Sequence, residues 1–182
     1  MRKTLAQLQA DLLRSFDDPS TSGINEGRLF DLLKDTLETI TPAYGALITS
    51  SPLVQSLTTV DQVLPWEGVY VAQEPEYSAD HATGAVTRHD APCMNRITVN
   101  VNVELAANRE VEMTLYADNV ATVWQAKAIG SGSGRPSVLS LEALHYSTAA
   151  ITYQLKVLVD QATNVTFSNG IFVIAAVPVR EA

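Results

Sequence analysis

Residues 97–105, ITVNVNVEL, alternate apolar and polar side chains over their whole length, and residues 151–159, ITYQLKVLV, do the same. Successive side chains of a β-strand point to opposite faces, so each stretch predicts a strand with one buried and one solvent-facing side. Less regular versions of this pattern indicate further strands in residues 43–50, 63–72, 111–117, 120–129, 138–144 and 171–179. Because short, turn-rich connections join these segments, we predict a mainly β fold, an antiparallel β-sandwich of the jelly-roll or a related type.

In the first 43 residues the apolar side chains recur with a different period. Apolar residues recur there at every third or fourth position, which predicts two short amphipathic α-helices, separated by a turn at residues 17–23 and ended by Pro42. Two such helices bury too little apolar surface to fold alone, so we expect residues 1–43 to anchor the chain or to bundle with other copies. Residues 44–182 then form the sandwich domain. The expected anchor or interface residues are Leu5, Leu8, Leu12, Phe16, Leu29, Phe30, Leu33, Leu37 and Ile40.

The composition excludes several classes of function. Of the 182 residues 46% are hydrophobic, and 12 basic residues against 20 acidic ones give a net charge of −8. Such a chain can bury a core, and its acidic surface repels phosphates, so we expect no nucleic-acid partner. No stretch reaches the ~18 apolar residues of a membrane span, and polar residues interrupt the N-terminal leucines where a signal peptide would be continuous. We therefore expect no membrane partner and assembly in the cytoplasm.

Candidate cofactor and metal sites lack the spacing that their chemistry needs. The glycine-rich stretch 130–134 has neither the lysine nor the following helix of a phosphate-binding loop, so a hairpin tip is the simpler interpretation. His89 and Cys93 are four residues apart, without the second ligand pair that zinc sites use. We expect no cofactor and no metal; a site built from His81 or His89 of three copies is the alternative left open.

Catalytic patterns are missing as well. No serine lies in a nucleophile elbow, which acyl transfer on an α/β-hydrolase fold requires. Two pairs of carboxylates, Glu74 with Glu76 and Glu110 with Glu112, occupy alternate positions, as on a solvated strand face rather than across a glycosidase cleft. We therefore expect no catalytic residue and no enzyme activity.

Two tryptophans are candidates for a binding surface. Trp66 and Trp124 fall in predicted strands, where exposed rings could stack on sugars as in lectin-like sandwiches. Aromatic residues in strands more often belong to a core or an interface, because each buries a large apolar area. Exposure of both rings on one sheet would favour ligand binding, and burial would favour a structural role.

The sequence also resembles a known class of protein. Residues 4–40, TLAQLQADLLRSFDDPSTSGINEGRLFDLLKDTLETI, followed by AYGALI, are similar to the start of many tailed-bacteriophage virion proteins, in which two short helices precede a compact β-sandwich. Tyr44-Gly45-Ala46, Trp66-Glu67-Gly68 and Asn95-Arg96-Ile97 match pieces of the trimeric jelly rolls of the tumour-necrosis-factor (TNF) type. Asp118-Asn119 stands where members of that family often have an Asn-Gly turn, and is a permissive substitute.

This resemblance implies a function. It leads us to expect a homotrimeric structural component of a phage particle, either a head decoration or fibre protein or a tail fibre or adaptor, located in the virion. The expected partners are copies of the chain itself and other virion proteins of the capsid or tail. The alternative is a lectin-like module on the virion surface that binds a host-surface glycan through Trp66, Trp124 or the loop 74–92.

Overall fold

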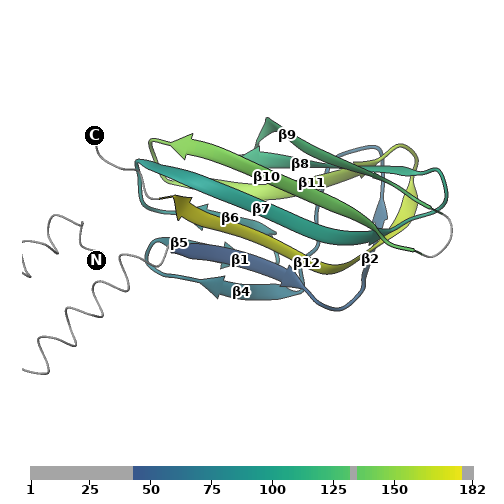
Figure 1. Ribbon diagram of the computed structural model, residues 1–182, viewed down its shortest axis with the longest axis horizontal. Coiled ribbons are helices and arrows are strands. Elements are labelled where there is room, and N and C mark those ends of the chain that lie inside the picture. The colour runs from purple at the N-terminus through teal and green to yellow at the C-terminus, as the bar shows by residue number, and fades with distance from the viewer. Residues whose placement is uncertain (1–42, 132–134, 178–182) are drawn as a thin grey trace, which may run out of the picture. The chain divides into compact units, whose positions relative to one another are not determined.

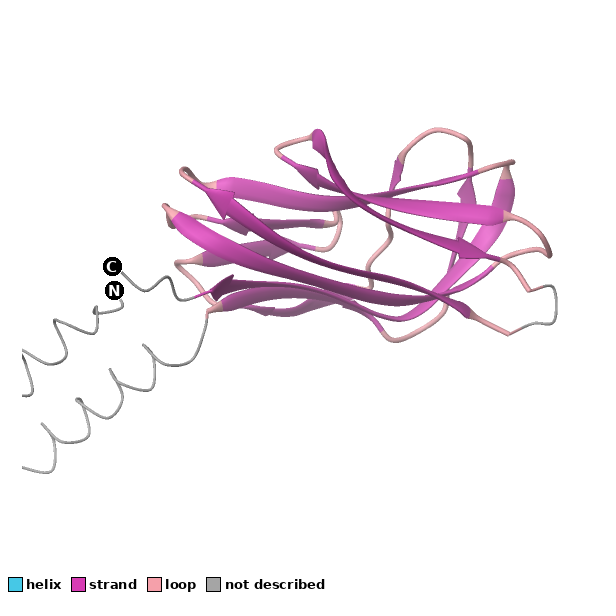
Figure 2. Ribbon diagram, turned by 45° about the horizontal axis from the view of Figure 1, so that its top comes forward, coloured by secondary structure: helices cyan, strands magenta, loops and turns pink. Residues whose placement is uncertain are grey.

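Residues 43–131 and 135–177 are described by a computed structural model (Figure 1). The two N-terminal helices and the nine anchor residues predicted above fall in residues 1–42 and lie outside the described residues. The described part folds as two antiparallel β-sheets packed face to face, which Figure 2 shows from a second direction. Within it, no helix is long and apolar enough to cross a membrane.

Twelve strands of the described part form the two sheets. The first, which we call the β7 sheet, has the order β10-β7-β12-β1-β4, and β2 pairs with the start of β12. Its strands are β1 (Tyr44–Thr49), β2 (Leu53–Leu57), β4 (Gly68–Ala72), β7 (Cys93–Glu104), β10 (Ser137–Ser147) and β12 (Thr163–Val177). The second, the β11 sheet, has the order β5-β6-β11-β8-β9, and β3 pairs with β11. Its strands are β3 (Gln62–Val63), β5 (Tyr77–Asp80), β6 (Ala85–Arg88), β8 (Glu110–Ala117), β9 (Val120–Ile129) and β11 (Ile151–Val159).

The period of two in the sequence places the core between the sheets. On β7 the apolar residues from Ile97 to Val103 point inward and are at most 1% exposed. The inward residues of β11 face them from the other sheet, and that strand coincides with the predicted segment 151–159. The predicted antiparallel β-sandwich is therefore confirmed. The largest fully buried side chains include Tyr77, Tyr153, Phe167, Phe172, Leu47 and Met113.

Asp118 and Asn119 connect β8 to β9 as a two-residue hairpin loop. Their φ angles are 48° and 64°, and positive φ at both positions is what a type I′ turn requires. Asp and Asn adopt this conformation more readily than other side chains, so the turn forms without a glycine. Asp118 Oδ1 also accepts a hydrogen bond from Thr152 N at 2.9 Å, which joins the turn to β11.

Glu67 stabilises the turn between β1 and β2. Its carboxylate accepts hydrogen bonds of 2.7–3.2 Å from the N–H and hydroxyl groups of Ser50 and Ser51. These donors favour the charged form, the Ser51 N–H most of all, and lower the pKa of Glu67 to about 2.

Residues 50–92 differ from the sequence prediction. The pattern predicts none of β2, β3, β5 and β6, each of which has five residues or fewer. The segment 74–92, interpreted as a polar loop, contains the β5–β6 hairpin, which pairs with β11 through β6. Strands this short have too few alternating positions to show a period, so tertiary pairing decides them. Trp66 lies in the connection between β3 and β4, not in a strand.

Candidate self-association surface

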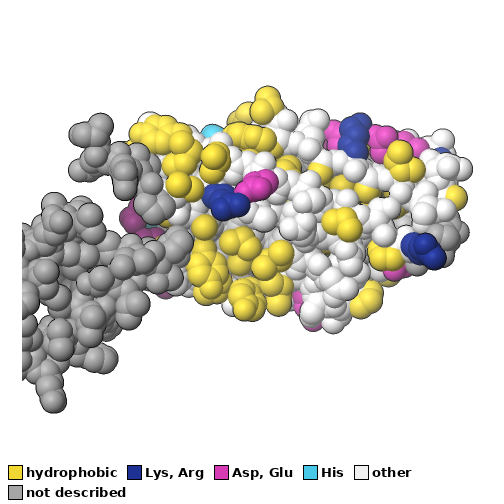
Figure 3. Space-filling model, viewed as in Figure 1, with side chains coloured by type: hydrophobic (Ala, Val, Ile, Leu, Met, Phe, Trp, Pro, Cys, Tyr) yellow, Lys and Arg dark blue, Asp and Glu magenta, His cyan; other side chains and the backbone are white. Residues whose placement is uncertain are grey.

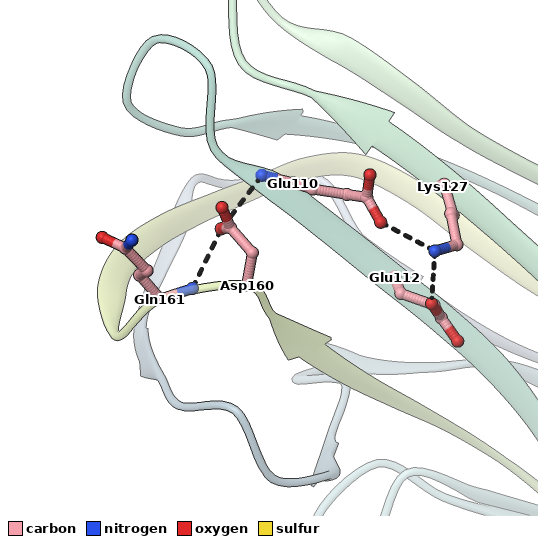
Figure 4. Close-up of polar contacts among 5 residues, drawn as sticks. All are labelled: Glu110, Glu112, Lys127, Asp160 and Gln161. Atoms are coloured by element: carbon pink, nitrogen blue, oxygen red, sulfur yellow. Dashed lines mark hydrogen bonds and ion pairs between the residues drawn. The ribbon is translucent and has the colours of Figure 1, made fainter.

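The outer face of the β11 sheet is mainly polar along β8 and β11. Lys127 Nζ of β9 lies 2.7 Å from Glu110 Oε1 and 2.8 Å from Glu112 Oε2 of β8 (Figure 4). Hydrogen bonds to Glu110 and then to Glu112 raise the pKa of Lys127. Beside them, Asp160 Oδ1 accepts hydrogen bonds from the N–H groups of Glu110 and Gln161. Paired charges of this kind suit a face that stays in water, as predicted for the two glutamates.

The outer face of the β7 sheet divides into two halves (Figure 3). On one half the strand register places apolar side chains next to each other: Met94 stands between Tyr146 and Val177. We call this the apolar half; it consists of Tyr44, Ile48, Val71, Met94, Leu144, Tyr146, Ile171, Val173, Ala175 and Val177. Leu144 is 57% exposed and Tyr146 is 53% exposed. The other half carries mainly polar side chains, such as Asn100, Asn102, Ser140 and Ser168.

One ion pair lies within the apolar half. Arg96 of β7 and Glu142 of β10 are joined by a hydrogen bond from Arg96 Nε to Glu142 Oε1 at 2.7 Å. Arg96 Nη2 contacts the same carboxylate oxygen. The pair forms one wall of an open hollow of about 680 Å³, whose other lining residues are Trp124, Ala143, Leu144 and Val177.

A second apolar surface follows the edge of the sandwich. β9 and β10 are the end strands of their sheets, so in the described part of the chain neither has a strand paired to its outer side. The two strands lie beside each other at the same edge of the sandwich. β9 exposes Val123 (88%), Val120 (69%) and Ile129 (60%), and Trp124 is partly exposed beside the hollow. We call these four residues and the free sides of the two strands the β9–β10 edge.

The two tryptophans named as candidates for a binding surface are not brought together. Trp66 is 5% exposed and its ring stacks on Phe172 with centroids 6.0 Å apart, which corrects the expectation that it contacts a ligand. Its connection runs from one sheet to the other, since Leu64 N–H donates to Leu155 O of β11 and Glu67 N–H donates to Ile48 O of β1, and Trp66 packs into the core between them. Trp124 makes an edge contact with His145 and keeps part of its ring in solvent.

The other chemically notable residues have structural partners. Cys93 is buried, and its Sγ lies 3.4 Å from Ser147 Oγ. Asn95 Nδ2 donates to Tyr153 OH at 3.1 Å, and Tyr153 OH lies 2.7 Å from His145 Nδ1. Burial raises the pKa of Tyr153. These groups satisfy each other inside the sandwich and present no nucleophile at the surface.

Two of the residues considered as metal ligands, His89 and Cys93, contact serine hydroxyls. His89 Nε2 lies 2.9 Å from Ser78 Oγ, across the β5–β6 hairpin. Within residues 43–131 and 135–177, no group of three His, Cys, Asp or Glu side chains is close enough to hold a metal ion. Glu76, expected on a solvated face, is instead 9% exposed.

Comparison with known structures identifies this arrangement of strands. Murine APRIL at pH 5.0 superposes with a TM-score of 0.56 at 7% identity, over 75% of this chain and 100% of that chain. The globular domain of the zebrafish complement 1qA protein gives 0.55 at 9% identity, over 76% and 99% of the two chains. Eiger TNF from S. frugiperda gives 0.53 at 10% identity, over 78% and 96%. The fold is a TNF-like jelly roll. No family model and no curated protein matches the sequence.

The apolar half of this TNF-like jelly roll was not predicted from the sequence. A signal was present: residues 171–177, IFVIAAV, are apolar at every position. A strand with one face in water alternates, whereas a strand covered on both faces is apolar throughout. In the structure Phe172 and Ile174 point into the core, so Ile171, Val173 and Ala175 face outward.

Proposed function

We propose that this chain is a homotrimeric β-sandwich module that serves as a structural component of a bacteriophage particle. One observation carries the self-association: the β7 sheet has an apolar outer half, while the outward side chains of β8 and β11 in the other sheet are mainly polar. Monomeric proteins rarely expose apolar patches larger than a few hundred Å², and such patches mark interaction sites. The apolar half is therefore the surface that another copy covers.

The presence of two different apolar surfaces supports a closed ring. A twofold dimer brings the same patch of both subunits together, whereas a cyclic trimer joins one patch of each copy to a different patch of the next. The apolar half and the β9–β10 edge lie on adjoining sides of the sandwich, and each copy presents both. Repetition of this contact around an axis closes a ring without leaving either surface in water.

The phage role rests on the N-terminal sequence and on the acidic, charge-poor composition of the chain. Residues 4–40 resemble the helical start of tailed-phage virion proteins, and an anchor followed by a sandwich suits a head decoration or fibre protein, or a tail fibre or adaptor. A capsid or tail protein is then the docking partner of residues 1–43, and the virion is the location. An acidic sandwich domain with few charged residues is compatible with exposure on the surface of a particle.

A glycan-binding role has one supporting observation. Trp124 lines the hollow beside Arg96 and Glu142, and an aromatic face next to hydrogen-bonding groups is a combination that sugars bind. Binding of the purified protein to a glycan array, lost on Trp124→Ala, would favour it. The burial of Trp66 removes the second ring that this alternative needs.

Light scattering coupled to size-exclusion chromatography tests the trimer directly. The full-length chain should elute as a species of three times its mass of 19.7 kDa across micromolar concentrations. A stable monomer over this range would contradict self-association. Mass spectrometry of purified particles of the phage that encodes the chain tests the virion role, which requires the protein to be present in a fixed ratio to the capsid or tail proteins.

A further inference from the structure

The Arg96–Glu142 pair is an exception within the apolar half. Arg96 has apolar neighbours across the strands, since it stands between Leu144 of β10 and Ala175 of β12, while Glu142 pairs with Thr98 of β7. Among the described residues that face outward from this half, Arg96 and Glu142 are the only charged ones. In the monomer the side chain of Arg96 is 59% exposed and that of Glu142 is 60% exposed. An ion pair this exposed adds little to the stability of a fold, so the fold alone does not explain it.

The geometry of the pair leaves hydrogen-bonding groups available. Arg96 Nε and Nη2 both contact one oxygen, Glu142 Oε1. Glu142 Oε2 and Arg96 Nη1 have no hydrogen-bond partner in the described part of the chain. An acceptor and a donor held side by side within apolar surface select a partner that brings the complementary donor and acceptor.

A second copy of the chain carries such groups on its β9–β10 edge. End strands have unpaired backbone N–H and C=O groups along their free side, and both β9 and β10 are end strands. The exposed Val120 and Val123 on the same edge supply apolar area to cover the rest of the apolar half. We propose that the Arg96–Glu142 pair fixes the register of self-association, because it admits the β9–β10 edge of a second copy only where backbone groups meet Glu142 Oε2 and Arg96 Nη1. This inference rests on the proposed self-association.

Buried ion pairs act more on specificity than on affinity. Removal of water from both charges has a cost that their mutual attraction and new hydrogen bonds roughly offset, so apolar residues of similar size often associate as tightly. Removal of one partner leaves the other charge buried and alone, which is much more unfavourable than removal of both. A comparison of single substitutions with the double substitution therefore distinguishes an ion pair that is buried in the interface from one that remains in water.

The test compares Arg96→Met, Glu142→Leu and the Arg96→Met/Glu142→Leu double variant in the full-length chain. Each single substitution should raise the trimer's dissociation constant by about 100-fold or more, as expected for an unpaired charge in an interface. The double variant should associate within about tenfold of the wild type. Native mass spectrometry should show that it forms a mixture of oligomers in place of one species, since the register is no longer fixed.

Lys156→Met is the matched control, because it removes a charge from β11, which belongs to neither apolar surface, and should leave association unchanged. Thermal unfolding checks that each variant folds, and Glu142→Gln replaces Glu142→Leu if the latter does not. A wild-type monomer would overturn both this inference and the proposed function. A wild-type trimer whose single variants associate normally would overturn this inference alone, as would a double variant that is as weak as the singles or forms a single species.

Discussion

Replacement of Leu144 by serine should weaken the trimer and leave the fold intact. Leu144 is 57% exposed in the separate chain. Full burial of a leucine side chain contributes about 2 kcal/mol, so burial of the exposed part contributes about 1 kcal/mol per copy. Over three copies this is about 3 kcal/mol, which corresponds to an increase of roughly two orders of magnitude in the trimer's dissociation constant. The free energy of unfolding of the separate chain should fall by less than about 0.5 kcal/mol, because an exposed side chain makes few contacts in its own sandwich.

A dilution series followed by light scattering measures this effect, with urea unfolding of the dissociated chain as the test of the fold. Val60→Ser is the control, because Val60 is 67% exposed in the connection between β2 and β3 and belongs to neither apolar surface. If Leu144→Ser dissociates at the same concentration as Val60→Ser and the wild type, the apolar half is not covered in the trimer, and the reasoning fails.

Three further predictions concern stability. Glu67→Gln should lower the midpoint of thermal unfolding at pH 7, and the difference from the wild type should shrink between about pH 4.5 and 2. The pKa of Glu67 in the folded chain lies below the usual glutamate pKa, so its contribution to stability is present above the usual pKa and is lost as the pH falls through the lowered one. An unchanged difference at pH 2 would contradict this. Tyr153→Phe should cost about 1–3 kcal/mol in urea unfolding, since Asn95 Nδ2 loses a buried acceptor; an unaltered midpoint would show that the hydroxyl is dispensable. Gly130→Ala should destabilise by about 3 kcal/mol, because its Cβ would lie 2.1 Å from a backbone carbonyl oxygen, whereas Gly68→Ala meets nothing within 4 Å and should have little effect. Equal effects of the two glycine substitutions would refute this.

The sequence by itself determined which segments become the long strands. Residues 97–103 and 151–159 alternate so regularly that only an extended strand places all their apolar side chains on one side. Asp118-Asn119 likewise determined a tight hairpin, because few residue pairs adopt positive φ twice in succession. These signals are local, since side-chain direction and backbone conformation are set within a few residues, and they were sufficient to predict an antiparallel β-sandwich.

The tertiary structure alone decided which faces are covered and which side chains meet. Alternation distinguishes the two faces of a strand but does not say what packs against either face. The outer surface of the β7 sheet could be described only from the strand register, which places Ala175, Arg96 and Leu144 side by side on β12, β7 and β10. Trp66 is buried because Phe172, more than a hundred residues away in sequence, lies beneath it. The apolar half and its ion pair are products of strand order, and strand order depends on contacts between distant segments that no local pattern encodes.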